Sequence, residues 1–258
     1  MTARKRDGKP IHTPRYLLRR RIILSALRPL DRGTFLEVGC GRGELLAWLD
    51  RLGFTGVGLE ISDVVLPLAH AAAAPLAPRI AIAESLDDLK GRQFDYLMSF
   101  EVLEHIEDDR GLLSQWLEHL AQDGRFVCTV PAHMKLWSSS DESVGHVRRY
   151  ERDDLVALLS DVGLDVEKIW VYGYPLVLFT GPLRDLFYRV RGRNRDERSA
   201  MDRTLTSSTD STFGIPGSMR SLARAAIEVL GFVFHYLGLP LRRTDFGDGY
   251  LVIAKRQS

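Results

Sequence analysis

Short apolar runs alternate with segments of helical periodicity along most of the chain. The apolar runs predict strands at residues 34–38, 56–61, 79–83, 96–100, 125–130, 166–171 and 250–254. Apolar residues spaced as on one helical face predict helices at residues 16–30, 44–52, 64–73, 112–121, 152–162 and 222–239. This alternation predicts an α/β protein with a seven-stranded, mostly parallel sheet and helices on both faces.

The same pattern divides the chain into three regions. A basic helical segment (residues 1–33) precedes a core formed by residues 34–172 and 248–258, and residues 173–247 form a helical insertion. Residues 191–221 contain only six apolar side chains and are predicted as a flexible loop, because so few cannot offset the entropy of ordering. The insertion leaves the sixth strand at its carboxyl end, where ligands bind in parallel sheets, so it is predicted to be a lid or substrate platform. Its predicted aromatic surface comprises Tyr172, Tyr174, Phe179, Phe187 and Tyr188.

Composition narrows the class of protein. With 258 residues, 45% hydrophobic and 27% charged, the chain is typical of a globular protein and unlike a disordered or channel protein. Cys40 and Cys128 are too few for a disulfide framework or a thiolate zinc site, and residues 1–14 contain no apolar signal region. A cytoplasmic location is therefore expected.

Charge is balanced overall but unevenly distributed. The net charge is +1, although residues 1–32 carry ten Arg and Lys against two Asp, and residues 84–123 carry eleven acids against three bases. No basic patch with interleaved aromatic residues is visible beyond Arg19–Arg21, so a nucleic-acid partner is not expected.

A glycine-rich turn follows the first predicted strand. Gly39, Gly41 and Gly43 stand where backbone must turn tightly and approach a ligand, and Glu60 ends the second strand, where its carboxylate can accept hydrogen bonds from ribose hydroxyls. The spacing is GxGxG, and Glu44 stands where a dinucleotide-binding GxGxxG turn would continue. The turn therefore favours a nucleoside cofactor other than NAD.

Five segments in order resemble the class I S-adenosylmethionine (SAM) dependent methyltransferases. They are FLEVGCGRGELL (35–46), GVGLEIS (56–62), AESL (83–86), FDYLMSFEVLEHIED (94–108) and DGRFVCTVP (123–131). The resemblance implies a Rossmann-like fold whose sixth strand is parallel to the first five and whose seventh is antiparallel.

The same resemblance implies a set of SAM contacts. Glu37 and the backbone around Gly39, Cys40 and Gly41 would hold the methionine portion, with some of the arginines between positions 15 and 21 near its carboxylate. The remaining contacts would be Glu60 with the ribose, Ile61 and Ala83–Glu84 with the adenine, and Ser99–Phe100 closing the site.

An acidic and histidine-containing motif, EVLEH, follows the fourth predicted strand and is expected to open a helix. In a helix Glu101, Glu104 and His105 would share one face and could bind a divalent cation such as Mg, Mn, Fe or Zn. Alternatively, the two acids are exposed and stabilise the helix dipole. The nearby Asp108, Asp109 and Glu118 are interpreted as solvated.

The segment GHVRRY (145–150) resembles one that follows the fifth strand in ubiquinone-type O-methyltransferases and small-RNA 2′-O-methyltransferases. This resemblance implies a metal site of Glu101, Glu104, His105 and His146. Related enzymes also carry an EVLEH-like string without a demonstrated metal, and His105 or His146 would then be the general base. Arg148 and Arg149 either bind an acidic substrate group or form a solvated edge.

Three further side chains or segments have structural interpretations. His133 is expected in a loop, and His235 is expected on a helix surface. Residues 138–141 are also expected to form a polar loop. The apolar stretch 225–240 is too short to span a bilayer comfortably. It either packs in the core against residues 174–188, forms a homodimer interface, or contacts the inner membrane face peripherally.

The predicted function is SAM-dependent methylation of a hydroxyl on a small or amphipathic, lipid-like acceptor, with or without a divalent metal. The alternatives are N- or C-methylation without metal, a non-catalytic SAM-fold binding protein, and an NAD-dependent oxidoreductase.

Overall fold

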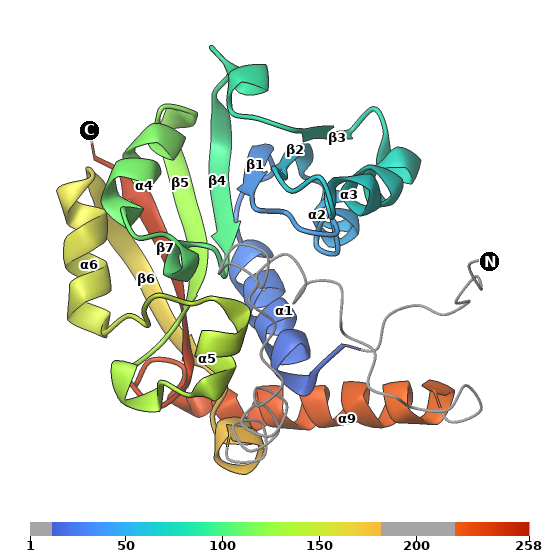
Figure 1. Ribbon diagram of the computed structural model, residues 1–258, viewed down its shortest axis with the longest axis vertical. Coiled ribbons are helices and arrows are strands. Elements are labelled where there is room, and N and C mark those ends of the chain that lie inside the picture. Colours follow the sequence, from blue (N-terminus) through green and yellow to red (C-terminus); the bar gives the residue numbers. More distant parts are fainter. Residues whose placement is uncertain (1–11, 182–219, 258) are drawn as a thin grey trace.

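A seven-stranded sheet organises the computed structural model, which describes residues 12–181 and 220–257. The strands are β1 (Thr34–Val38), β2 (Thr55–Leu59), β3 (Ile80–Ala83), β4 (Phe94–Phe100), β5 (Leu120–Pro131), β6 (Leu164–Tyr172) and β7 (Gly249–Arg256). Their order is β3-β2-β1-β4-β5-β7-β6, and every pairing is parallel except those of β7 with β5 and β6 (Figure 1). The predicted mostly parallel sheet, including the antiparallel last strand, is confirmed.

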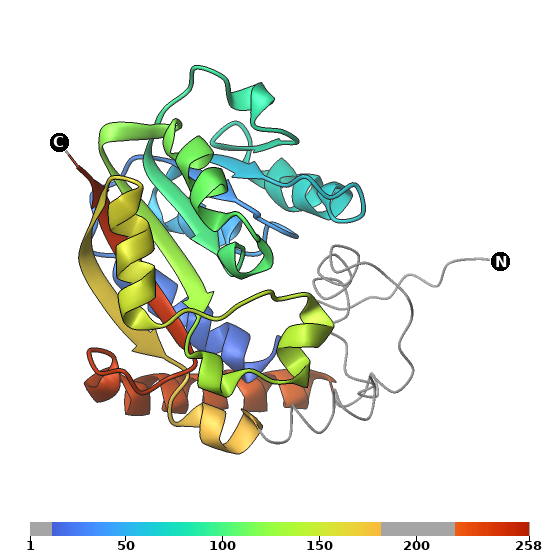
Figure 2. The same ribbon diagram turned by 60° about the vertical axis from the view of Figure 1, so that its left-hand side comes forward.

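Helices cover both faces of this sheet. They are α1 (Pro14–Leu27), α2 (Leu46–Leu52), α3 (Leu66–Ala73), α4 (Asp109–Leu117), α5 (Ser139–Val144), α6 (Arg152–Asp161) and α9 (Arg220–Gly238). Short 3-10 turns are η1 (Ala74–Leu76), η2 (Asp87–Leu89), η3 (Leu103–His105), η4 (Met134–Leu136) and η6 (Leu239–Leu241). Helices α4 and α6 lie on the face toward the viewer in Figure 2, and α1 lies on the opposite face with α2 and α3.

Each face has its own apolar core. Trp116 of α4 and Leu155 of α6 pack on one side of the sheet, and Ile23 of α1 and Leu49 of α2 pack on the other. Because the middle strands are buried on both faces, they appear in the sequence as nearly continuous apolar runs.

The EVLEH motif does not open a helix, contrary to expectation. Glu101 has a left-handed backbone (φ 59°), only a single 3-10 turn follows, and α4 begins at Asp109. Asp108 caps α4 by accepting a hydrogen bond from the amide of Gly111. A left-handed residue ends strand geometry abruptly, so the side chains after it do not share one helical face.

Two other boundaries differ from the sequence prediction. Residues expected as a polar loop form α5, which begins with a capping box between Ser138 and Asp141. Strand β5 begins at Leu120, inside the range expected as helix, because Leu120 pairs with Phe94 before a register shift.

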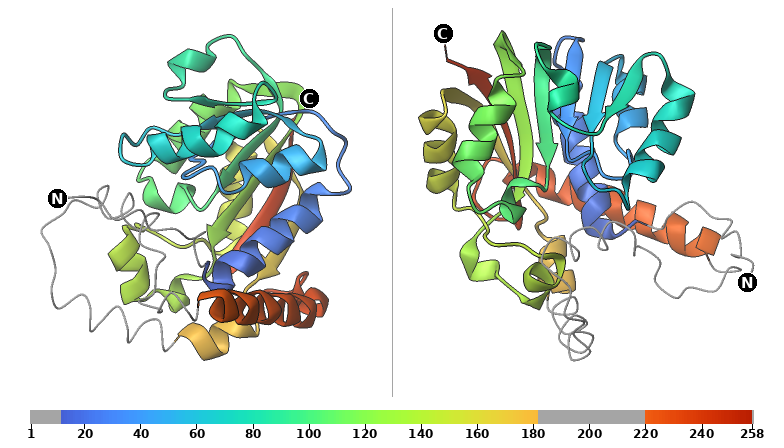
Figure 3. Two further views of the ribbon diagram at one scale, coloured as in Figure 1. Left: turned by 90° about the vertical axis from the view of Figure 1, so that its right-hand side faces the viewer. Right: turned by 45° about the horizontal axis from the view of Figure 1, so that its top comes forward.

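Within the insertion, the structure describes a short helical stretch at residues 176–181 and the long helix α9. Helix α9 crosses α1, where Gly231 approaches Leu17 closely enough that a Cβ would lie 3.0 Å from the Leu17 Cβ (Figure 3). Of the predicted flexible loop, residues 191–219 lie outside the described residues, as do Phe187 and Tyr188. Among residues 12–181 and 220–257, no helix has both the length and the apolar character needed to span a bilayer.

Candidate functional site

The glycine turn after β1 adopts the backbone that its residues allow. Gly39, Gly41 and Gly43 all have left-handed backbones (φ 70°, 56° and 70°), which side chains rarely permit. A Cβ on Gly39 would lie 2.6 Å from Cγ2 of Val102, whereas one on Gly41 would meet open space. The turn is therefore tight toward the β4 side and open at its tip.

Glu60 ties this turn to the end of β2. One carboxylate oxygen accepts from the amide of Gly41 and the other from the amide of Ser62, both at 2.9 Å. An ionised carboxylate has about four lone-pair positions, so these two bonds leave room for ribose hydroxyls. Its ribose contact stays a prediction.

Glu37 lies at the end of β1 and is buried. Burial raises its pKa to about 8, against the opposing charge of Arg19, and its Oε2 atom has no hydrogen-bond partner among the described residues. A buried carboxylate oxygen without a donor is costly unless a ligand supplies one. The ammonium of an amino-acid ligand would do so.

Six other residues were predicted to contact the cofactor: Cys40, Ile61, Ala83, Glu84, Ser99 and Phe100. Cys40, Ala83 and Ser99 are buried, and the Ser99 hydroxyl has no partner in the described part of the chain. Ile61 is 67% exposed after β2, and the exposed Glu84 lies 3.2 Å from His70. These side chains lie around the carboxyl ends of β1 to β4, but their cofactor contacts stay predictions.

Glu104, His105 and His146 form a cluster whose ligand atoms lie within 4.8 Å of one another. Nδ1 of His146 lies 2.9 Å from the Asp141 carboxylate, and Nδ1 of His105 lies 3.2 Å from the Gly145 carbonyl. Because these oxygens accept, we assign the ring protons to Nδ1, which leaves the lone pairs on Nε2. Metal-binding histidines usually have this arrangement.

The Glu104 carboxylate of this cluster lacks hydrogen-bond donors in the described part of the chain. Glu104 is fully buried, and neither oxygen has a hydrogen bond among the described residues. Its Oε1 lies 3.7 Å from Nε2 of His146. Burial and the nearby Glu101 raise the pKa of Glu104 well above its usual value, and burial with His146 lowers the pKa of His105 to about 4. One carboxylate and two imidazoles with these properties suit a divalent cation.

The fourth predicted ligand, Glu101, contacts two arginines and a tyrosine instead. Its carboxylate accepts from Arg15 (2.8 Å) and the Tyr172 hydroxyl (2.9 Å), and Arg19 lies at 3.2 Å. Burial alone would raise its pKa, but the two arginines outweigh burial and hold the pKa well below its usual range. The predicted four-ligand set is thus corrected to a cluster of three with Glu101 in an adjoining ion-pair network.

Several residues expected in solvent are buried instead. Arg149 donates to both carboxylate oxygens of Asp141 at 2.9 Å, so it belongs to neither a solvated edge nor an anion site. Asp109 accepts from Arg148 and Tyr150, both at 2.8 Å.

His133 lies in a loop, as expected, whereas the expected surface position of His235 needs correction. His133 is buried, with Nδ1 at 2.9 Å from Glu151 and Nε2 at 2.9 Å from the Asp245 carbonyl. His235 is half-buried beside α1 rather than on an open helix surface.

Sequence reasoning did not assign site roles to Asp141 or Tyr172. The Asp141 capping box is visible as Ser138-x-x-Asp141, but its contact with His146 follows only from the turn at Gly145. Tyr172 was expected as lid surface, and its contact with Glu101 joins residues 71 positions apart.

Comparison with known proteins is consistent with this geometry. Residues 11–169 match the model of a family described as "Methyltransferase domain". The chain is 31% identical over 130 residues to the ubiquinone biosynthesis O-methyltransferase of Bartonella quintana, covering 48% of this chain and 52% of that protein. It is also 31% identical over 170 residues to the ubiquinone biosynthesis O-methyltransferase of Brucella anthropi, covering 59% of this chain and 68% of that protein. The chain thus spans about half the length of the first of these relatives.

A solved structure shares the fold. The 1,6-didemethyltoxoflavin-N1-methyltransferase of Burkholderia thailandensis, with its substrate and S-adenosylhomocysteine bound, aligns with a TM-score of 0.53 and 14% identity. The alignment covers 94% of this chain and 79% of that protein. This likeness shows a shared fold, and the family match by itself favours methyl transfer over the NAD-dependent alternative.

Proposed function

This chain belongs to the methyltransferase domain family. We propose that it is a SAM-dependent methyltransferase and that it methylates a hydroxyl of a small or amphipathic acceptor. We further propose that Glu104, His105 and His146 hold a divalent metal for this reaction. The main observation in support of a metal site is the buried Glu104 carboxylate. It has no hydrogen bond among the described residues and lies close to the imidazoles of His105 and His146. The names of the curated relatives make hydroxylated quinone precursors the first acceptors to test.

The residues around the glycine turn suit the amino-acid and ribose portions of SAM. Glu37 offers an unpaired buried oxygen to the ammonium, and Glu60 retains lone pairs for the ribose. Arg15 and Arg19 extend from α1 toward the same edge of the sheet, where either could bind the methionine carboxylate. These contacts would fix the sulfonium methyl in place, and positioning is the main contribution that a methyltransferase makes.

In this proposal, the acceptor oxygen attacks the methyl carbon and the carbon–sulfur bond breaks with its electron pair going to sulfur. The hydroxyl proton passes to solvent water, and the products are the methyl ether and S-adenosylhomocysteine. A divalent metal would make the acceptor hydroxyl more acidic. A pKa of about 4 makes the neutral imidazole of His105 a weak base near pH 7, so its geometry suits ligation better than proton removal.

Metal-dependent O-methylation is tested with purified full-length protein, SAM and a panel of catechols. Mass spectrometry should detect an O-methylated product that disappears with EDTA and returns when Mg, Mn or Zn is added. Turnover unaffected by EDTA would exclude metal assistance, and SAM binding without turnover on any acceptor would favour a binding protein.

A second candidate function is metal-free O- or N-methylation with His146 as the base. The observation in its favour is the Asp141–His146 pair, since a carboxylate on Nδ1 orients an imidazole for proton removal at Nε2. This candidate predicts EDTA-resistant turnover that His146→Gln abolishes.

Cofactor affinity is expected to depend on the ionisation of Glu37. Below its pKa of about 8 the carboxyl binds a proton in the ligand-free chain, and a ligand ammonium must displace that proton. Affinity for S-adenosylhomocysteine should therefore rise with pH, about tenfold or more between about pH 6 and about pH 9, as calorimetry would measure.

Glu37→Gln is the matched control for that titration, because the ligand's own amino group still titrates in it. The variant should bind more weakly at high pH and show a much flatter pH profile. Identical slopes in the variant and the wild type would refute the role of Glu37.

A further inference from the structure

Helix α9 carries a broad apolar face that the rest of the described chain does not cover. Six of its exposed side chains, from Val233 at 44% to Val229 at 61%, recur at helical spacing on one side. We call this set the outer face: Val229, Leu230, Phe232, Val233, Tyr236 and Leu237. Contiguous apolar surface of this kind on a helix usually marks an interaction site.

The two ionisable side chains of α9 that the structure describes, Glu228 and His235, lie on the side that faces α1. Glu228 pairs with Arg20 at 3.1 Å and Arg21 at 3.5 Å on α1, and Gly231 lies against Leu17. Burial with the nearby arginines lowers the pKa of His235 on the same side. In a helix adapted to water the charged residues would face outward. The outer face of α9 is therefore adapted to an apolar environment.

Neighbouring segments enlarge this surface. In the 176–181 stretch, Leu178 and Phe179 are exposed, and the Phe179 ring lies 6.2 Å from that of Phe234 on α9. After α9, Phe246 is also exposed and lies near Tyr174. Figure 3 shows the 176–181 stretch along the same side of the molecule as α9.

The sequence around α9 is positively charged. Residues 182–243 contain eleven Arg against six acids, and among the described residues Arg243, which follows α9, is exposed. Basic residues beside an apolar helix attract anionic lipid headgroups, while aromatic residues such as Phe232 and Tyr236 favour the interfacial region. This combination matches an anionic lipid surface better than a second copy of the same basic segment.

We propose that the outer face of α9 docks on an anionic membrane surface, with the helix axis in the plane of the bilayer. Helix α1 crosses α9 on one side, so the opposite side can meet the lipid without any rearrangement of the described fold. Burying these six large apolar side chains in the lipid interface would be favourable, because it removes their apolar surface from water.

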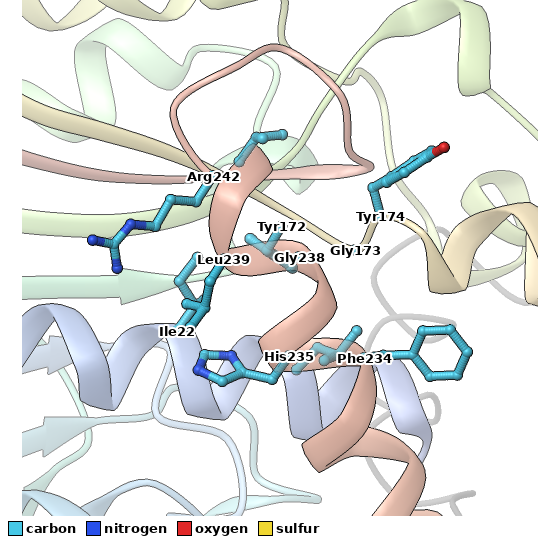
Figure 4. A pocket seen from close by; sticks show the side chains of 11 residues that line it. Ile22, Tyr172, Gly173, Tyr174, Phe234, His235, Gly238, Leu239 and Arg242 are labelled. Atoms are coloured by element: carbon cyan, nitrogen blue, oxygen red, sulfur yellow. The ribbon is translucent and has the colours of Figure 1, made fainter.

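Docking in this way also brings the candidate site to the lipid. Phe234 and Gly238 of α9 line a cavity of about 20 Å³ together with Tyr172, whose hydroxyl donates to Glu101 (Figure 4). Helix α9 thus carries the docking face on one side, and other residues of the same helix line a cavity beside the Glu101 network. If the proposed function holds, on which this step rests, the acceptor is an amphipathic molecule taken from the membrane.

The docking proposal is tested by co-sedimentation of the full chain with vesicles. We expect the wild type to sediment with phosphatidylglycerol–phosphatidylcholine vesicles, to stay in the supernatant with phosphatidylcholine alone, and to dissociate as salt increases. Val233→Glu should lower the partition coefficient about tenfold or more, because it places a charge on the docking face.

Val156→Glu is the matched control, since Val156 is 36% exposed on α6, on another side of the molecule. It should sediment like the wild type, and both variants should still bind S-adenosylhomocysteine. An equal loss in the two variants, or wild type remaining in the supernatant with anionic vesicles, would overturn the proposal. So would a dimer in light scattering that Val233→Glu converts to monomer without any vesicle binding. None of these readouts requires methyl transfer, so they are independent of the proposed function.

Discussion

Glu104→Gln is expected to lower methyl-transfer turnover by about 100-fold or more and to abolish stabilisation by divalent metal. The substitution keeps the shape of the side chain but removes the only carboxylate of the three-residue cluster. A metal bound at about 100 times its Kd would stabilise the wild type by about 2.7 kcal/mol, a clear rise in Tm. Turnover and thermal unfolding with and without added metal measure both effects.

The control for this experiment is Glu118→Gln, which alters an exposed acid just after α4. It should retain wild-type turnover and the metal-dependent rise in Tm. Because Glu104 is buried with a raised pKa, its replacement should not itself unfold the chain. A Glu104→Gln protein with wild-type turnover and metal response would show that the cluster is only structural.

Arg149→Met is expected to lower the free energy of unfolding by about 3–5 kcal/mol, because it leaves the buried Asp141 carboxylate without its main counter-charge. Urea denaturation measures the change. Arg125→Met removes a comparable two-bond contact with Glu167, but at the surface, and should cost about 1 kcal/mol or less. Equal losses in both variants would contradict this account.

A double variant separates stability from site geometry. Arg149→Met with Asp141→Leu replaces the buried pair by apolar side chains and should recover much of the lost stability. It also removes the Asp141 contact with His146, so metal affinity should stay about 10–100-fold below that of the wild type. Recovery of both properties would show that Asp141 does not orient His146.

The same pair predicts a pH effect. Burial alone would raise the pKa of Asp141, but His146 and Arg149 outweigh it and depress the pKa. The resulting stability is present above the unfolded pKa of about 3.9 and is lost as pH falls toward the folded pKa. Acid unfolding of Arg149→Met should therefore be shallower below about pH 4 than that of the wild type.

Local sequence patterns were sufficient for much of the fold. Strand β1 was predicted with its exact limits, and the glycine turn with Glu60 was placed correctly at the ends of β1 and β2. These features depend on a short apolar run that is buried on both faces, a φ that only glycine adopts readily, and strand ends that meet at one edge of the sheet. The alternation of elements then left few possible topologies.

The metal cluster was predicted only in part, for a reason visible at Glu101. Spacing alone suggested that Glu101 would join Glu104 on one helical face, but spacing does not reveal a left-handed residue. Arg15, which is 86 positions away, binds the Glu101 carboxylate in the folded chain. Conversely, Glu104, His105 and His146 do come together, because the turn at Gly145 brings His146 beside the η3 turn.

The sequence by itself thus determined the α/β class, the cofactor turn and the residue types of the candidate cluster, since all of these follow from local pattern and chemistry. Only the tertiary structure decided which charges are neutralised. It directs Glu228 of α9 to arginines of α1, Glu101 to Arg15 and Arg19, and Asp141 to Arg149. The reason is physical: a buried charge is stable only beside a partner, and packing brings these partners together from distant parts of the chain. The same packing leaves Glu104 without a hydrogen bond and the outer face of α9 without a cover among the described residues.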